Sequence, residues 1–168
     1  LKLCEILFVK YQLKLKNVEI KSSLFTIKIK MSKLNEIINF YQADLEKVNN
    51  LILENSIGKS DLILQITQNL INSGGKRIRP LLLIISANLC GSKDPNSYLN
   101  LASAVEMIHT ATLLHDDVVD MSEIRRGKKT ANAIWDNKSA ILVGDYLFSL
   151  SFQLMVRSQN LAVLDLSL

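Results

Sequence analysis

The stretch "EMIHTATLLHDDVVD", residues 106–120, places three carboxylates beside leucines and valines. Its apolar residues recur at helical spacing, so the pattern predicts a helix over about residues 96–121. On that helix Asp116 and Asp120 lie four residues apart on one face, and His109 falls on the same stripe. Ionised side chains are rarely buried unless they are paired or bind a metal. The acids therefore form either a solvated helix face or a binding site for a cation.

The spacing of these acids suits Mg²⁺ as that cation. Adjacent carboxylates repel each other unless a positive charge lies between them. Mg²⁺ binds one or two carboxylates and completes its octahedron with water and substrate phosphate. A metal site at this helix would therefore also be a phosphate site.

Two basic segments strengthen the case for phosphate. The first, "GGKRIRP" at residues 74–80, puts Lys76, Arg77 and Arg79 on a turn that leads into a helix, and the second, "RRGKKT", spans residues 125–130. Glycine lets the backbone approach an anion, a helix N-terminus favours negative charge, and arginine binds phosphate oxygens in pairs. Each segment alone is also typical of a solvated loop. Together with the acids, they predict a site for two diphosphates, one of them held through Mg²⁺.

The composition indicates one globular, all-helical domain. The chain has 168 residues, 48% of them hydrophobic, with only six glycines and two prolines to punctuate short strands. Cys4 and Cys90 have no metal-site spacing, and Cys90 follows an apolar run that predicts a buried thiol. The helical periodicity predicts a bundle with helices over residues 32–56, 60–73, 80–90, 96–121 and 131–157, with Pro80 in the first turn of the third and a polar loop before the last.

The positive net charge belongs to one end of the chain. The whole chain carries +4, whereas residues 1–30 contain seven lysines and two glutamates and the remainder contains 13 basic and 14 acidic residues. The remainder has no global basic field for nucleic acid. We expect residues 1–30 to be an atypical Lys-rich extension with Met31 as the natural start; the alternative is a basic tail that touches an anionic membrane surface. No apolar run is long enough to predict a transmembrane helix, so we expect a soluble, cytoplasmic protein.

The order of these motifs carries a family resemblance. "GGKRIRP" followed by "AVEMIHTATLLHDDVVDMSEIRRGKKTANAIWDNKSAILVGDYLFSLSFQLM", residues 104–155, resembles the trans-polyprenyl diphosphate synthases, especially the long-chain bacterial type such as octaprenyl diphosphate synthase. The resemblance covers roughly residues 31–165. It implies the N-terminal half of an isoprenoid-synthase helix bundle and, in the full-length family, a homodimer. The implied reaction is the Mg²⁺-dependent head-to-tail condensation of isopentenyl diphosphate with an allylic diphosphate, which yields a long-chain polyprenyl diphosphate for quinone side chains.

The resemblance also assigns roles to individual residues. Asp116, Asp117 and Asp120 would be the catalytic first aspartate-rich motif, with Asp116 and Asp120 as the direct Mg²⁺ ligands. Arg125 would help them to hold the allylic diphosphate. The isopentenyl diphosphate would be bound by Lys76, Arg79, His109 and Arg126. Ala111 and Thr112, one turn before the acids, are small residues and would leave room for a long product.

The sequence departs from the family after Asp120. The family places a second aspartate-rich motif on a facing helix, whereas the acids that follow here are isolated: Glu123, Asp136, Asp145 and Asp165. We therefore expect residues 31–168 to form a truncated polyprenyl synthase domain that is inactive alone. The alternative is a non-catalytic helical subunit or interaction module that pairs with a complementary chain. A generic helical protein that binds Mg²⁺ and phosphate would not explain the order of the motifs.

Overall fold

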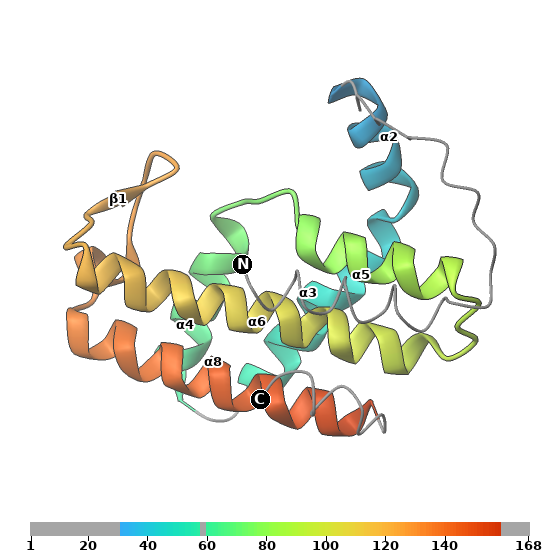
Figure 1. Ribbon diagram of the computed structural model, residues 1–168. Coiled ribbons are helices and arrows are strands. Elements are labelled where there is room, and N and C mark those ends of the chain that lie inside the picture. Colours follow the sequence, from blue (N-terminus) through green and yellow to red (C-terminus); the bar gives the residue numbers. More distant parts are fainter. Residues whose placement is uncertain (1–30, 58–59, 159–168) are drawn as a thin grey trace.

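The computed structural model describes residues 31–57 and 60–158, which form an all-helical bundle with one short hairpin (Figure 1). The predicted all-α class is therefore confirmed. The expectation that residues 1–30 form an extension falls outside the described residues. The elements are α2 (Met31–Phe40), α3 (Gln42–Ser56), α4 (Asp61–Asn72), α5 (Ile78–Leu89), α6 (Pro95–Val119), β1 (Ile124–Arg125), β2 (Lys128–Lys129), α7 (Ala131–Ile134) and α8 (Asn137–Arg157).

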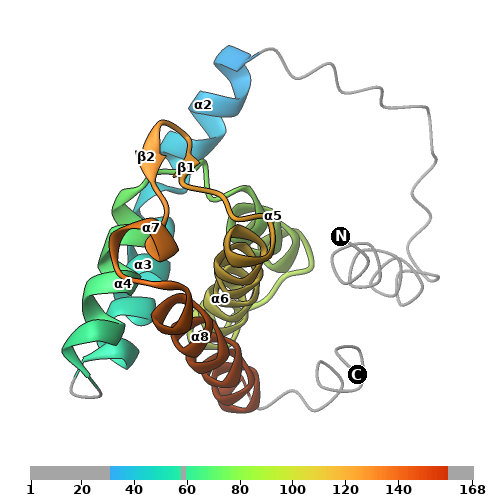
Figure 2. The ribbon, with the colours of Figure 1, turned by 90° about the vertical axis from the view of Figure 1, so that its left-hand side faces the viewer.

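Helix α6 is the central helix of the bundle. It runs alongside α8 over most of its length and also packs on α5 and α3, and Figure 2 shows α3 and α4 on one side of the α5–α6–α8 group. Ala102, Ala104 and Ala111 are buried where α6 meets its neighbours, so the helix backbones can approach closely. Two hydrophobic clusters meet along α6, one around Met107 and the other around Leu114. Helix α6 therefore contacts α3, α5, α7 and α8 directly, whereas α2 packs on α3, and α4 packs on α3, α7 and α8.

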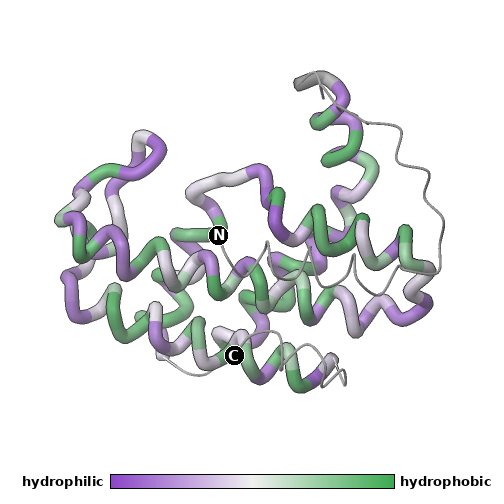
Figure 3. The backbone as a smooth tube through the Cα atoms, viewed as in Figure 1, coloured by the Kyte–Doolittle hydropathy of each residue, from purple (hydrophilic) through white to green (hydrophobic). Residues whose placement is uncertain are grey.

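Helices α5 and α8 expose several large apolar side chains. Figure 3 shows that hydrophobic residues recur along both helices. Leu82 and Leu89 on α5 are 58% and 83% exposed, and Leu142 and Val156 on α8 are 55% and 56% exposed. Helix α8 is the one helix in the described part of the chain that is long and apolar enough to cross a membrane, but core helices of soluble proteins meet the same criterion. Its inner side is buried against α6, as in a core helix.

The helix boundaries differ from the sequence-based expectation at three places. The helix predicted over residues 32–56 is broken at Tyr41, and the helix predicted over 131–157 is broken at Trp135, whose φ and ψ are −104° and −85°. Asp136 then caps α8 by accepting a 2.7 Å hydrogen bond from the Ser139 backbone N–H. Helix α5 begins at Ile78, two residues before Pro80, because Arg77 adopts a left-handed conformation with φ +47° and serves as its N-cap.

Two local expectations were wrong. The polar loop before the last helix forms a hairpin, in which Ile124 pairs with Lys129 and Arg125 with Lys128. Cys90 is exposed and not buried, because α5 has ended at Leu89 and the chain turns away there at Gly91.

His115 on α6 lies over Gly144 on α8. The His115 Nε2 atom is 3.3 Å from the Ile141 carbonyl oxygen and 3.3 Å from the Asp145 carboxylate. A Cβ at Gly144 would overlap the imidazole ring. The glycine therefore accommodates the histidine that directly precedes the acidic motif.

This packing predicts a change of sign in a double-mutant cycle. In the wild-type background, Gly144→Ala should lower the free energy of unfolding by about 1 kcal/mol, at the low end for overpacking, because the ring can turn toward solvent. In a His115→Ala background the same change should raise it by up to about 1 kcal/mol, because alanine is the better helix former. Urea denaturation followed by circular dichroism measures both. Destabilisation of equal size in the two backgrounds would contradict the proposed overlap.

Candidate functional site

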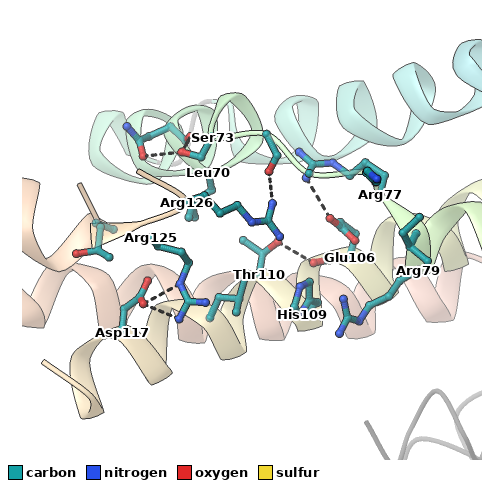
Figure 4. A pocket seen from close by; sticks show the side chains of 18 of the residues that line it. Leu70, Ser73, Arg77, Arg79, Glu106, His109, Thr110, Asp117, Arg125 and Arg126 are labelled. Carbon is teal, nitrogen blue, oxygen red and sulfur yellow. Dashed lines mark hydrogen bonds and ion pairs between the residues drawn. The ribbon is translucent and has the colours of Figure 1, made fainter. Parts of the chain in front are cut away.

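A cavity of about 670 Å³ opens between the turn at residues 74–79, the middle of α6 and the β1–β2 hairpin (Figure 4). Three segments that are distant in sequence therefore meet at one place. The charged and titratable residues that line it are mostly basic: Lys76, Arg77, Arg79, His109, Arg125, Arg126 and Lys129, together with the acids Glu106 and Asp117.

The hairpin is hydrogen-bonded to the turn at residues 74–79 and to the end of α4 just before it; this turn is called the glycine turn below. The Arg126 guanidinium donates a hydrogen bond to the Gly74 carbonyl, and the Lys128 ammonium donates one of 2.9 Å to the Asn72 carbonyl. A Cβ at Gly75 would lie 2.8 Å from one Arg126 nitrogen and 3.0 Å from one Arg77 nitrogen. A larger residue at position 75 would push at least one of these guanidiniums away from the turn.

Arg77 joins the glycine turn to three helices. Its guanidinium lies 3.2 Å from the Glu106 carboxylate on α6, and it donates hydrogen bonds of 3.1 Å to the Asn49 side chain on α3 and 2.9 Å to the Ile71 carbonyl on α4. Sequence patterns assign no role to Glu106 and place Arg77 only within the basic segment at residues 74–80. A signal for the pair was present, because a lone acid on an otherwise apolar helix needs a partner when it is buried.

His109 is neutral at physiological pH in this environment. It is half-buried, and its pKa is lowered to about 4 by burial and by the positive charges of Arg79 and Arg126 in particular. The pKa of the Glu106 carboxyl is instead raised by burial, against the opposing effect of the neighbouring arginines. Both shifts follow from a partly dehydrated pocket, and the lowered pKa of His109 also reflects the surplus of positive charge.

The three acids of the motif fall into two environments. Asp117 is buried, and its Oδ1 atom lies 2.8 Å from Nε and 2.7 Å from a terminal nitrogen of Arg125 (Figure 4). Asp116 and Asp120 are exposed at the end of α6, and neither forms an ion pair within residues 31–57 and 60–158. Asp117 thus anchors the hairpin to α6, whereas Asp116 and Asp120 present their carboxylates to solvent.

The carboxylates of Asp116 and Asp120 fit a hard cation that keeps part of its water. They lie on successive turns, and no cluster of three or more acidic, histidine or cysteine side chains that could enclose a metal occurs in the described part of the chain. Such an open pair suits Mg²⁺, which is commonly bound by one or two carboxylates plus substrate phosphate.

The structure brings most of the predicted site residues together. Lys76, Arg79, His109, Arg126 and Arg125 all line the same cavity, and Asp116 and Asp120 lie beyond its lining at the C-terminal end of α6. Ala111 is buried with Leu114 in the core, whereas Thr112 is exposed and its hydroxyl donates a 2.7 Å hydrogen bond to the His109 carbonyl. The predicted control of product length by Ala111 and Thr112 stays a prediction.

Known proteins share both the sequence and the fold. The Polyprenyl synthetase family profile matches residues 60–167. Octaprenyl diphosphate synthase of Escherichia coli (strain K12) is 42% identical over 135 residues, which make up 80% of this chain and 41% of that protein.

Solved structures agree with the sequence comparison. A decaprenyl diphosphate synthase from Rhodobacter capsulatus superposes with a TM-score of 0.75 at 48% identity. The match covers 80% of this chain and 42% of the R. capsulatus protein. A polyprenyl synthase from Caulobacter crescentus, complexed with calcium and isoprenyl diphosphate, superposes with a TM-score of 0.74 at 42% identity. The match covers 79% of this chain and 40% of the C. crescentus protein. This chain thus spans about two fifths of the length of these relatives. Its motifs, its fold and these similarities together establish that the chain belongs to the polyprenyl synthetase family, a family of prenyltransferases.

Proposed function

We propose that the cavity binds the diphosphate group of isopentenyl diphosphate during Mg²⁺-dependent synthesis of a polyprenyl diphosphate. The observation that carries the proposal is the convergence of Lys76, Arg79, Arg126 and a neutral His109 on one cavity. The C. crescentus relative was solved with an isoprenyl diphosphate, which supports a ligand of this chemical class.

The charge balance of the cavity favours a polyanion. Six of its lining residues are basic and two are acidic, and each acid is paired with an arginine: Glu106 with Arg77 and Asp117 with Arg125. Within the described ranges, Arg79 and Arg126 form no ion pair. Guanidinium groups bind phosphate oxygens through paired hydrogen bonds, so these two arginines suit a diphosphate.

Residues beside the cavity would stabilise the leaving group and shield the reacting carbons in a head-to-tail condensation. Asp116 and Asp120 would hold Mg²⁺, which when bound neutralises negative charge on the allylic diphosphate as it leaves. Arg125 lines the cavity and lies five residues after Asp120, and it would stabilise the same leaving group. The carbon–oxygen bond of the allylic substrate would break and release diphosphate. The isopentenyl double bond would then form the new carbon–carbon bond to the allylic carbon, and the proton lost in this step would pass to the released diphosphate. Leu70 and Leu113 line the cavity beside the cations and would keep water from the reacting carbons.

The finer features of the reaction belong to the same proposal. A long-chain product, such as a quinone side-chain precursor, is favoured by the small side chains of Ala111 and Thr112. A homodimer, as in the full-length family, would cover apolar surface of the kind exposed on α5 and α8. A cytoplasmic location and a peripheral membrane contact stay predictions.

The polypeptide of these 168 residues should not complete the reaction alone, because it supplies one aspartate-rich motif and not two. The alternative function is a helical subunit or interaction module that pairs with a complementary chain. The observation that favours it is the exposed apolar surface of α5 and α8, including Leu82, Leu89, Leu142 and Val156.

A turnover assay tests the inactivity. Farnesyl diphosphate, labelled isopentenyl diphosphate and Mg²⁺ are incubated with the purified 168-residue polypeptide, and labelled prenyl products are separated by chain length. We expect none, because this polypeptide lacks the carboxylates of the second aspartate-rich motif, which would be needed to bind Mg²⁺ from the facing side. Long labelled products from this polypeptide alone would refute the expectation.

A second prediction concerns the metal. Mg²⁺ should tighten the binding of farnesyl diphosphate by roughly tenfold or more, and Asp116→Asn should remove that gain, since the amide cannot replace the carboxylate charge. Calorimetry with and without Mg²⁺ measures the effect. Glu123→Gln, which neutralises an exposed acid three residues beyond the motif, is the control and should keep the gain. An unchanged Mg²⁺ effect in Asp116→Asn would rule out Asp116 as a ligand.

A third prediction concerns His109. Inorganic diphosphate bound in the cavity should raise the pKa of His109 from about 4 by about one unit or more, because its negative charge offsets the arginines. Arg79→Gln should raise it in the absence of ligand for the same reason. NMR titration of the imidazole signals measures both, and the signals of His115, which does not line the cavity, should not respond to diphosphate. A His109 titration that is indifferent to diphosphate would place the ligand elsewhere.

A further inference from the structure

Glu106 is an acid in a cavity that should attract anions. Its side chain is only 8% exposed, and its carboxylate points from α6 toward the guanidinium of Arg77 (Figure 4). A carboxylate at this place repels a bound diphosphate, and it also costs free energy to bury. Glu106 therefore needs a role that outweighs both effects.

The partner of Glu106 is the residue that fixes the glycine turn. Arg77 sits in a left-handed backbone conformation, which is uncommon for a residue with a side chain, and it is the N-cap of α5. Its guanidinium is shared between Glu106, Asn49 and the Ile71 carbonyl, so α6, α3 and the end of α4 all hold it. Without the carboxylate, a buried guanidinium would lose its counter-charge and would turn toward solvent.

Movement of Arg77 would change the positions of the neighbouring cationic side chains in the cavity. Lys76 precedes Arg77 directly, and Arg79 follows two residues later on the first turn of α5. On the other side, Gly75 is enclosed between the guanidiniums of Arg77 and Arg126, and Arg126 holds the Gly74 carbonyl. The position of Arg77 thus determines where three of the cations can meet a ligand.

We propose that Glu106 is a positioning residue of the diphosphate cavity: it holds the Arg77 guanidinium and, through Arg77, fixes the turn that places Lys76 and Arg79. The inference rests on the proposed diphosphate site. Glu106 need not touch the ligand, and its contribution to binding is indirect.

The direct and indirect effects of Glu106 have opposite signs. If Glu106 acted only as a nearby negative charge, Glu106→Gln would tighten diphosphate binding, because the change removes a repulsion. If Glu106 positions the turn, the same change weakens binding by about tenfold, the loss typical of a hydrogen bond to a charged group. The direction of the change in affinity therefore separates the two roles.

Calorimetry with isopentenyl diphosphate and no Mg²⁺ measures this direction. The titrations are run at pH 8, because burial raises the pKa of Glu106 and the wild-type carboxylate must be ionised. They are run well below the thermal midpoint of each variant, so that a change in stability alone leaves the affinity unchanged. Asp44→Asn is the matched control, because it removes an ion-paired carboxylate that does not line the cavity, and it should bind like wild type.

Arg77→Lys provides an independent variant if Glu106→Gln does not fold. It keeps the charge of the cavity but cannot reach the three partners of the guanidinium at once, so we expect binding to be weakened by about tenfold as well. In the double variant the two losses should not add, because both act through the same turn.

Each outcome decides the question. Weaker binding in both single variants, without additivity, supports the inference. Unchanged or tighter binding by Glu106→Gln, wild-type binding by Arg77→Lys, or fully additive losses would overturn it while the diphosphate site stands. A wild-type chain that does not bind isopentenyl diphosphate would overturn the proposed site, and the inference with it.

Discussion

The structure is organised around a concentration of positive charge that has to be held in place before any ligand arrives. Arginines and lysines from the glycine turn and from the hairpin face one cavity, and like charges at such separations repel one another. Two buried carboxylates, Glu106 and Asp117, offset part of this repulsion, and each is paired with one arginine. Both acids belong to α6. The remaining surplus is what a diphosphate would neutralise.

Helix α6 holds Glu106 and Asp117 in place because its other sides are packed against neighbouring helices. Its buried alanines and Met107 lie against α3, α5 and α8, and His115 packs over Gly144 directly before the acids. A side chain on a rigid helix loses little further freedom when it binds a ligand, which is the advantage of building a site on such an element. The loop residues of the site gain the same rigidity indirectly, through Arg77 and through the hydrogen bonds from the hairpin.

The sequence predicted those features that depend on local pattern. Periodicity indicated the helical class and placed α4 and α6 within a few residues, and the glycine and arginine motifs indicated residues that do meet at one cavity. Periodicity could not reveal the break at Tyr41, since the apolar stripe continues through that position. At Trp135 the stripe is interrupted by the polar residues 136–139, and Asp136 is a typical N-cap, so a local signal for this break was present. The strands of the hairpin are two residues long, too short for an alternating pattern to appear.

Contacts between distant residues were equally hidden. Arg77 and Glu106 lie 29 positions apart, and the sequence shows that each is charged but not that they form a pair. The separation of Asp117 from Asp116 and Asp120 also needed the structure, because helical spacing places the three acids on neighbouring turns without deciding which one the hairpin covers. The exposure of Cys90 depends on where α5 ends, and an apolar run does not specify its own last residue.

If the cavity binds isopentenyl diphosphate as proposed, a crystal structure with an unreactive thio analogue of that substrate should show it there. We expect diphosphate oxygens within hydrogen-bonding distance of Arg79, Arg126 and His109, close to Lys76, with Arg77 still bound to Glu106. A diphosphate bound at another surface, or bound in the cavity with these side chains turned away, would contradict it.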